Sequence, residues 1–233
     1  MTFLQLCQRV HLWTRQGNAL PGTVPTTTVG QTGTLAETVI HVTQAWIDIQ
    51  NALPLACVIS QDSHAITSGT RTILLSAISP TAIEVLPMFD PCRFVLCYLT
   101  ATGVSDSTPV RYVPYQQWRG YFDLGTRATG KPAWWTMRPG NTIELDPTPD
   151  ASYTLLWDVK NTPQTFSADA DDPANYPATN TGLQAPYHDA IVWKAVEYYA
   201  ETRGDAVMMA MAAKKYAEAY TRIANKYLPE VQW

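Results

Sequence analysis

Charged residues are scarce in this 233-residue sequence, since Asp, Glu, Lys and Arg together make up 15% of it. That share is low for a surface facing water, so Thr, Asn and Gln must supply much of the polar cover. The balance leans towards acid, with 20 acidic residues against 16 basic ones and a pI of about 5.5. The sequence therefore lacks the positive surface by which proteins grip the phosphates of nucleic acid.

Long hydrophobic runs are missing too, because no stretch approaches the ~20 apolar residues that cross a bilayer. The N-terminal residues have neither a charged leader nor a small-residue cleavage site, so we expect no signal peptide and no membrane partner. Cysteine is rare, and Cys7, Cys57, Cys92 and Cys97 form no C-x-x-C pair. We interpret these thiols as free and buried in a reducing cytoplasm, in preference to a metal site.

Motifs that carry catalysis are absent from the sequence. It has no P-loop, no G-x-G-x-x-G, no G-x-S-x-G and no H-E-x-x-H. Residues 126–131 (TRATGK) contain one glycine, and Pro132 interrupts the helix that would follow a phosphate loop. His188 and Asp189 stand at a predicted helix start, where a carboxylate stabilises the helix dipole, and we favour that role over a catalytic dyad. We predict that the protein is not an enzyme and needs no cofactor.

An acidic run at residues 169–173 invites a calcium interpretation. An EF-hand loop needs Gly at its sixth position and Glu at its twelfth. Counted from Asp169, these positions hold Ala174 and Asn180. We therefore predict a solvated turn here, and no metal ligand.

Helical periodicity is present at both ends of the chain. Thr2 and Thr34 are each followed three residues later by Gln or Glu, the capping-box pattern that opens a helix. Near the N-terminus, before Pro54, an apolar residue recurs every three or four positions, at Leu35, Val39, Val42, Trp46, Ile49 and Leu53. Near the C-terminus, Gly204 suits the end of one helix and Asp205 the cap of the next. The second of these helices has the stripe Met209, Ala213, Tyr216, Tyr220, Ile223 and Tyr227. Residues 1–54 and the hairpin at 186–228 are predicted to pack together as one bundle.

The middle of the chain, residues 55–162, has short β-rich runs broken by turn residues. Two of these runs are predicted to form a hairpin around residues 64–69. The predicted strands are 55–61, 70–75, 93–100, 109–113, 134–138, 142–145 and 153–159, with a short helix at 115–121. Because no long helix alternates with them, we expect a mostly antiparallel sheet. The predicted fold class is α+β, with a loop at 163–185 and a short tail at 229–233.

Aromatic residues gather around Trp134 and Trp135, with Tyr115, Trp118 and Tyr121 nearby in the sequence. Such a group could stack on sugars or on nucleic-acid bases. Because adjacent strand residues point to opposite faces, at most one of the two tryptophans belongs to the core. We favour core or subunit contact, and a carbohydrate-binding or cell-wall-degrading module stays an alternative function.

Six stretches carry a family resemblance in a consistent order along the chain. They are MTFLQLCQRV at 1–10, TLAETVIHVTQAWIDIQ at 34–50, GTRATGKP at 125–132, IELDPTPD at 143–150, DADDP at 169–173 and HDAIVWKAVEYYA at 188–200. Together they resemble the adaptor, or head-to-tail connector, proteins of tailed bacteriophages. Segment 175–185 departs from the resemblance, because it is longer than the usual loop before the C-terminal helices of that family.

The resemblance implies a structural protein of the virion neck, at the head-tail junction, assembled in the host cytoplasm. It implies a homo-oligomeric ring, commonly a dodecamer, that joins the portal protein to the tail nozzle or another tail protein. DNA would pass through the channel of this ring without specific binding. A different tail-completion or baseplate component is the nearest alternative.

Two sets of contact residues are expected on this basis. Portal or subunit contact is expected at Tyr220, Tyr227, Leu228, Pro229, Val231 and Trp233, where Trp233 would act as an apolar anchor on the terminal tail. Tail-side contact is expected at turn residues of the β region, namely Gly103, Asp106, Arg127 and Lys131.

Overall fold

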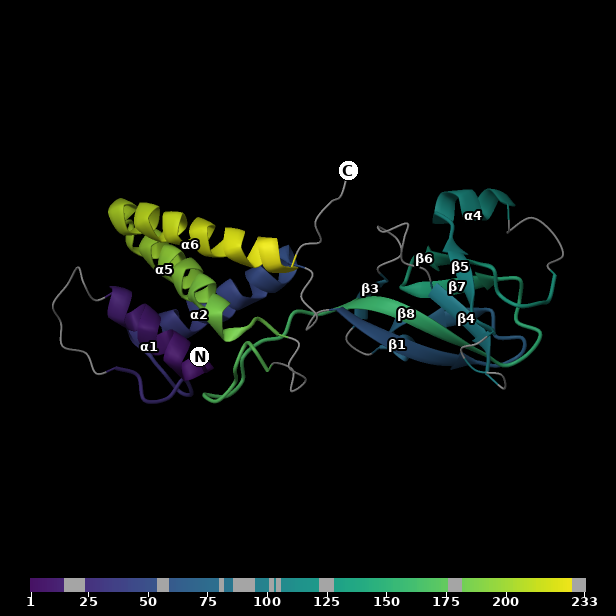
Figure 1. The fold of residues 1–233 in the computed structure, drawn as a ribbon, viewed down its shortest axis with the longest axis horizontal. Helices are drawn as coiled ribbons and strands as arrows, with labels where there is room; N and C mark the ends of the chain where they lie inside the picture. Colours follow the sequence, from purple (N-terminus) through teal and green to yellow (C-terminus); the bar gives the residue numbers. More distant parts are fainter. Residues whose placement is uncertain are drawn as a thin grey trace. The chain divides into compact units, whose positions relative to one another are not determined.

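The computed structural model describes residues 1–14, 24–53, 59–79, 82–85, 95–100, 103, 106–121, 128–175 and 182–227. It contains two compact units (Figure 1). The helical unit joins Met1–Val58 to Pro163–Trp233, and the sheet unit is Ile59–Thr162. Both ends of the chain supply helices and the middle supplies the sheet, so the predicted α+β class is confirmed.

The helical unit is built around α5. Its helices are α1 (Phe3–Thr14), α2 (Gly33–Ala52), η4 (Ala185–Tyr187), α5 (Asp189–Arg203) and α6 (Ala206–Tyr227). Helix α5 packs against both α1 and α2, and α6 lies along α5 (Figure 1). The apolar period of α2 is confirmed at Val42, Trp46, Ile49 and Leu53, all of which are buried.

Helix starts follow the sequence prediction at one N-terminal position and depart from it at the other. The Thr2 nitrogen donates to Gln5 Oε1 at 2.9 Å, and the Gln5 nitrogen donates to Thr2 Oγ1 at 3.4 Å, which confirms the first capping box. The second capping box, at Thr34, is wrong. Helix α2 begins at Gly33, so Thr34 lies inside its first turn, and Glu37 forms an ion pair with Arg203 instead.

The connection between α5 and α6 forms as predicted. Gly204 has a φ of 67°, the left-handed conformation that glycine adopts without a side-chain clash. Asp205 Oδ1 accepts a hydrogen bond from the Met208 nitrogen at 2.9 Å and so caps α6. Two residues therefore suffice to reverse the chain.

A mostly antiparallel sheet makes up the sheet unit. Its strands are β1 (Ile59–Ile66), β2 (Thr72–Leu74), β3 (Ala82–Val85), β4 (Val95–Leu99), β5 (Thr108–Tyr112), β6 (Trp134–Arg138), β7 (Thr142–Asp146) and β8 (Tyr153–Asn161). Their order is β1-β8-β4-β5-β6-β7-β2, and β3 also pairs with β8. Only β5 and β6 run parallel among these strands. Two short helices, α3 (Leu75–Ile78) and α4 (Tyr115–Tyr121), complete the unit.

The predicted hairpin between the first two β runs is wrong. Strand β1 pairs with β8, with Ile66 opposite Tyr153, whereas β2 pairs with β7, with Ile73 opposite Ile143. Ile66 and Ile73 are both buried in the core of the sheet unit, so these strands pair with distant partners that close the core and not with each other. Two pairs of predicted strands that follow each other in the sequence, β4 with β5 and β6 with β7, do pair with each other.

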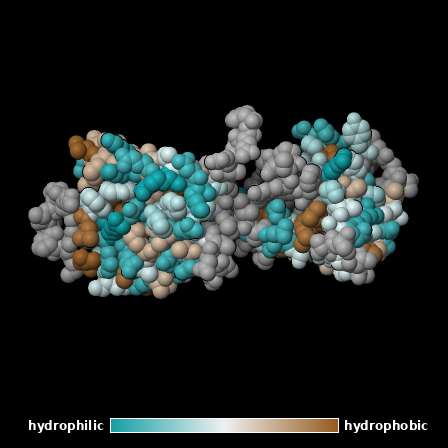
Figure 2. Space-filling view, in the orientation of Figure 1, coloured by the Kyte–Doolittle hydropathy of each residue, from teal (hydrophilic) through white to brown (hydrophobic). Residues whose placement is uncertain are grey.

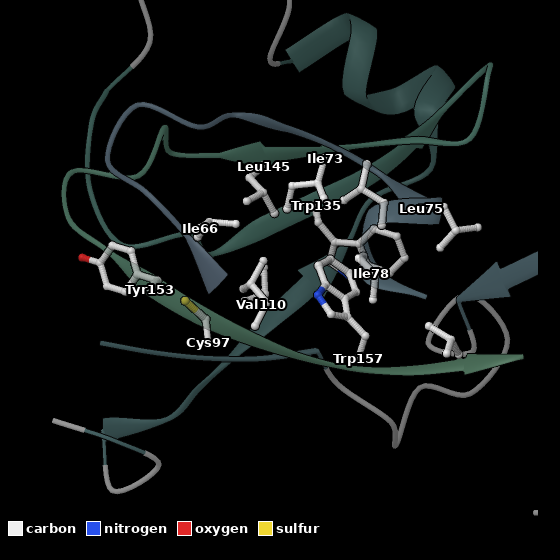
Figure 3. Close-up of a cluster of buried hydrophobic side chains, with 13 residues drawn as sticks. Ile66, Ile73, Leu75, Ile78, Cys97, Val110, Trp135, Leu145, Tyr153 and Trp157 are labelled. Atoms are coloured by element: carbon white, nitrogen blue, oxygen red, sulfur yellow. The ribbon is translucent and has the colours of Figure 1, made fainter. Parts of the chain in front are cut away.

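The core of the sheet unit, which Figure 3 shows in close-up, packs aliphatic side chains around two tryptophan rings. Trp135 and Trp157 are fully buried and meet edge to face, with ring centroids 5.4 Å apart. Leu145, Leu155 and Val110 pack in the same cluster. Burial of rings of this size gives the unit a hydrophobic core of its own.

Candidate functional site

The predicted tail-side residues lie on turns that the fold brings together. Lys131 Nζ is 3.0 Å from Asp106 Oδ2 and donates to the Asp106 carbonyl oxygen at 2.6 Å. Gly103 reaches this turn with a φ of 73°, and its nitrogen donates to the Leu99 carbonyl. Arg127 lies outside the described residues. Two segments chosen separately from the sequence therefore meet at one place.

A wider group of turns surrounds this ion pair. We call residues 67–70, 100, 103, 106, 128–131 and 147–152 the loop cluster. Backbone hydrogen bonds join its members, with Gly69 donating to Pro149 at 2.8 Å, Gly130 to Thr148 at 2.9 Å and Thr100 to Ser152 at 3.1 Å. A surface joined in this way is ordered before a partner arrives, which reduces the entropy lost on binding.

Tyr153 is a further anchor of the loop cluster. Its hydroxyl donates to Asp150 Oδ1 at 2.7 Å, and Ser68 Oγ donates to the Asp150 carbonyl at 3.1 Å. The hydrogen bond to Asp150, with burial as a second cause, raises the pKa of Tyr153 to about 12. This tyrosine therefore stays a neutral donor at any physiological pH.

The loop cluster lies at one end of the β1–β8 ladder. At the other end Ile59 is opposite Lys160, so the chain enters and leaves the sheet unit side by side. Ile66 and Tyr153, which adjoin the loop cluster, are paired at the end away from these connections. The loop cluster thus adjoins one end of the β1–β8 ladder, and the connections to the helical unit leave from the other end.

The predicted portal-side residues fall at the end of α6. The Tyr227 hydroxyl accepts a hydrogen bond from the Gln184 nitrogen at 3.2 Å, and its ring meets Tyr187 with centroids 5.9 Å apart. Tyr220 packs against Tyr216 at 5.8 Å. Four of the predicted residues lie outside the described part of the chain, namely Leu228, Pro229, Val231 and Trp233. The described end of α6 is therefore fixed to the segment that precedes α5.

Helix α6 presents a surface that the sequence stripe does not identify. The residues it buries are Ala212, Ala219 and Ile223, of which only Ile223 belongs to the predicted stripe. Met209, predicted to face inward, is 39% exposed. The small side chains of Ala212 and Ala219 allow α5 to approach closely, a signal that a search for large apolar residues overlooks.

The acidic run at residues 169–173 accepts hydrogen bonds from other parts of the helical unit. Asp169 accepts hydrogen bonds from the nitrogen and the hydroxyl of Thr28, and these bonds lower its pKa. The carbonyl oxygens of Asp169 and Asp171 accept from the first nitrogens of α1, at Leu4 and Phe3. The predicted solvated turn is thus a cap for α1. Among the residues that the structure describes, no group of His, Cys, Asp and Glu could hold a metal ion.

His188 is fully buried at the start of α5. Its Nε2 donates to the Leu183 carbonyl at 2.7 Å, which leaves Nδ1 to accept from the Met1 nitrogen at 2.7 Å. Burial lowers the pKa of this imidazole, so its neutral form is the native one. The neighbouring carboxylate of Asp189 pairs with Arg9 at 2.8 Å and does not contact the imidazole as a dyad would.

The aromatic group singled out in the sequence is dispersed. Trp118 and Trp135 are fully buried, and Trp134 is half-buried beneath the guanidinium of Arg111. The prediction that at most one of the adjacent tryptophans belongs to the core is confirmed. Tyr121, 79% exposed, is the one member of the group with an open ring. This arrangement does not form a stacking platform for sugars.

Two of the cysteines can be placed. Cys7 and Cys97 are buried and free, as predicted. Burial raises the pKa of the Cys7 thiol to about 12 and that of Cys97 to about 11, so neither is a reactive thiolate near neutral pH. Cys57 and Cys92 lie outside the described residues.

Comparison with known proteins identifies the family of the chain. In the described part of the chain, no helix combines the length and the apolar character needed to cross a membrane. A comparison with curated proteins gave no match. The profile of the SU10 adaptor protein family matches residues 1–232, almost the whole sequence. The chain therefore belongs to the SU10 adaptor protein family, whose members are structural head-tail adaptor proteins of bacteriophages.

Proposed function

We propose that copies of this protein form a ring in the neck of the virion, between the portal protein and the tail. The observation that carries the proposal is the match of one adaptor family to residues 1–232. A ring needs heterologous contacts, in which a patch on one copy meets a different patch on the next. The channel of the ring would let DNA pass, and an acid excess of 20 residues to 16 suits a wall that does not hold phosphates.

The portal side is assigned to the helical unit and the terminal tail. Residues 228–233 follow α6 and include Leu228, Val231 and Trp233. Tyr227 anchors the last described turn of α6 to Gln184, so the tail leaves from a fixed point. An aromatic residue that docks in a partner's pocket contributes strongly to binding.

Deletion of residues 229–233 tests this assignment. We expect the deletion variant to keep the thermal unfolding temperature of the full chain but to lose most of its binding to the portal protein of the same phage. Replacement of Trp233 by Ala should account for much of the loss, and Glu230→Gln is the matched control. Undiminished co-sedimentation of the deletion variant with the portal would contradict the portal-side assignment.

The tail side is assigned to the loop cluster. Its surface holds the pair Asp106 and Lys131, of which Asp106 is 52% exposed. Lys131→Asp should weaken capture of the tail protein. A chain carrying both Lys131→Asp and Asp106→Lys keeps an ion pair with the charges exchanged. If the pair only stabilises the turns, this double variant should bind the tail protein normally, whereas direct contact predicts that it stays defective.

A further inference from the structure

Helix α6 is exposed along the side that faces away from α5. Its outer stripe is Val207, Met211, Lys214, Glu218 and Asn225, spaced so that all lie on one side of a helix. Val207 is 83% exposed and Met211 41% exposed. In Figure 2 a small hydrophobic spot lies at the edge of the helical unit where α6 begins. Apolar side chains of this size in open water favour contact with another protein.

The charge of α6 is opposite to that of the unit it belongs to. The helix has four basic residues and one acidic residue, whereas the rest of the helical unit has ten acidic residues and four basic ones. Lys214, Lys215 and Arg222 are all exposed on or beside the outer stripe. A basic face on an otherwise acidic unit is complementary to the same unit of a second copy.

Helix α2 offers the matching surface. Its outer stripe is Ile40, Gln44, Ile47 and Asn51, which lies opposite the buried stripe at Val42, Trp46 and Ile49. Ile40 is 63% exposed. The helix contains two acidic residues, Glu37 and Asp48, and no Lys or Arg. Glu37 pairs with Arg203 of α5, and Asp48 accepts a hydrogen bond from the Tyr198 hydroxyl of α5, so both carboxylates lie on the side of α2 next to α5. The outer stripe of α2 therefore offers the exposed Ile40 among polar side chains, and the acidic balance that complements α6 comes from the helical unit as a whole.

We propose that the outer stripe of α6 in one copy packs against the outer stripe of α2 in the next copy. The inference rests on the proposed assembly of copies into a ring and names the two surfaces that form its contact. Val207 and Met211 would cover Ile40, while Lys214 and Arg222 would face the helical unit of the next copy, which is acidic overall. Because the two stripes differ, the contact is heterologous and can repeat from copy to copy. Binding to DNA by α6 is disfavoured, because its outer stripe begins with apolar side chains that phosphates would leave uncovered.

Two variants of the full chain test the contact by opposite changes of charge. The α6 variant carries Val207→Glu and Met211→Glu, and the α2 variant carries Ile40→Lys. Each places a charged side chain in the apolar contact of Val207, Met211 and Ile40, so self-association measured by sedimentation velocity, alone or on the portal protein, should weaken at least about tenfold. Val29→Glu, at a position 66% exposed and outside both stripes, is the control and should assemble as the unmodified chain does.

Mixing the two variants gives the sharpest result. The intact α6 of the α2 variant still fits the intact α2 of the α6 variant, and the other two faces bring Ile40→Lys against Val207→Glu and Met211→Glu, which carry the opposite charge. An equimolar mixture should therefore recover self-association that neither variant shows alone. Normal assembly by both variants would overturn the inference while leaving the proposed ring in place. An unmodified chain that stays monomeric both alone and on the portal would remove the ring itself. Binding of a DNA duplex that is lost in Lys214→Glu, with self-association unchanged, would also overturn the inference.

Discussion

Asp169 and Asp171 resemble ligands in the sequence, yet in the fold they are acceptors for backbone and hydroxyl donors. Asp171 Oδ2 accepts from the nitrogens of Ser167 and Ala168, at 2.6 and 2.8 Å, and so closes its own turn. Asp169 joins this turn to Thr28 in the connector before α2. Asp169 cannot be separated from a metal ligand by composition alone, because its partner Thr28 is 141 positions away in the sequence. Only the three-dimensional fold supplies that partner.

The lowered pKa of Asp169 predicts how stability responds to acid. The hydrogen bonds from Thr28 hold the folded pKa below its ordinary value of 3.8. The charged carboxylate therefore stabilises the fold fully above that value, and its contribution is lost as pH falls through the folded pKa. We expect Asp169→Asn to unfold at a lower temperature than the natural chain at pH 7, and this difference to shrink below about pH 4.

Thermal unfolding followed by circular dichroism in steps from pH 7 to pH 3 measures the effect. Glu218→Gln, at a side chain 51% exposed, is the control and should follow the natural chain throughout. A difference that stays constant down to pH 3 would mean that the charge of Asp169 contributes nothing.

His41 and His188 also make the fold less stable as pH falls, but they do so at higher pH than Asp169. Burial lowers both of their pKa values from 6.5, so their contribution is complete above about pH 6.5 and declines below it.

At the scale of helices and strands, features set by neighbouring residues could be predicted from the sequence, whereas pairings between distant segments could not. The turn at Gly204 is encoded by adjacent residues, so sequence reasoning places it correctly. The partners of β1 and β2 depend on which strand closes the core, which no local pattern states. The short elements β3 and α3 were not predicted, because four residues are too few to show a period. Only the turn of Gly103 and Asp106 and the turn of Lys131 were predicted as contact sites within the loop cluster, and their contact through Asp106 and Lys131 came only from the fold.

Gln50, near the end of α2, pairs with Gln164 in the segment that follows the sheet unit. Its amide donates to the Gln164 carbonyl at 2.8 Å and accepts from the Gln164 nitrogen at 2.9 Å, as a neighbouring strand would. Just beyond, Phe166 stacks on Phe3 with ring centroids 4.5 Å apart and lies 5.8 Å from Trp46. The end of α2 thereby fixes the point at which the chain re-enters the helical core.

Gln50→Leu should destabilise the helical unit by about 1–3 kcal/mol, because it removes both partners of the Gln164 backbone. Urea unfolding followed by tryptophan fluorescence would measure this loss. Gln44→Leu makes the same change at an exposed position of α2 and should be near neutral. Equal effects of the two substitutions would show that the pairing with Gln164 contributes no specific stability.

On the scale of the whole molecule, the chain builds two cores and crosses between them twice. The core of the sheet unit consists entirely of residues from 59–162. The buried stripes of α1, α2, α5 and α6 form the other core. For an adaptor, separate cores allow the surface that meets one neighbour to change in sequence without disturbing the surface that meets another. The contacts proposed for α2 and α6 belong to the helical unit, and the loop cluster belongs to the sheet unit.

Separate cores predict that each unit folds without the other. The pairing of Ile59 with Lys160 places the ends of the sheet unit about 5 Å apart, so a chain limited to residues 59–162 keeps its whole β1–β8 ladder. The same closeness allows a short Gly-Ser linker to replace this segment in the helical unit. We expect each piece to fold on its own. Circular dichroism should show one cooperative unfolding transition for each piece, and NMR should show dispersed amide signals. The piece with α2 and α6 should retain the self-association of the full chain, and the sheet piece should not.

A sheet piece that is unfolded alone but folds when the helical piece is added would contradict independent cores, because it would show that part of its stability comes from the other unit.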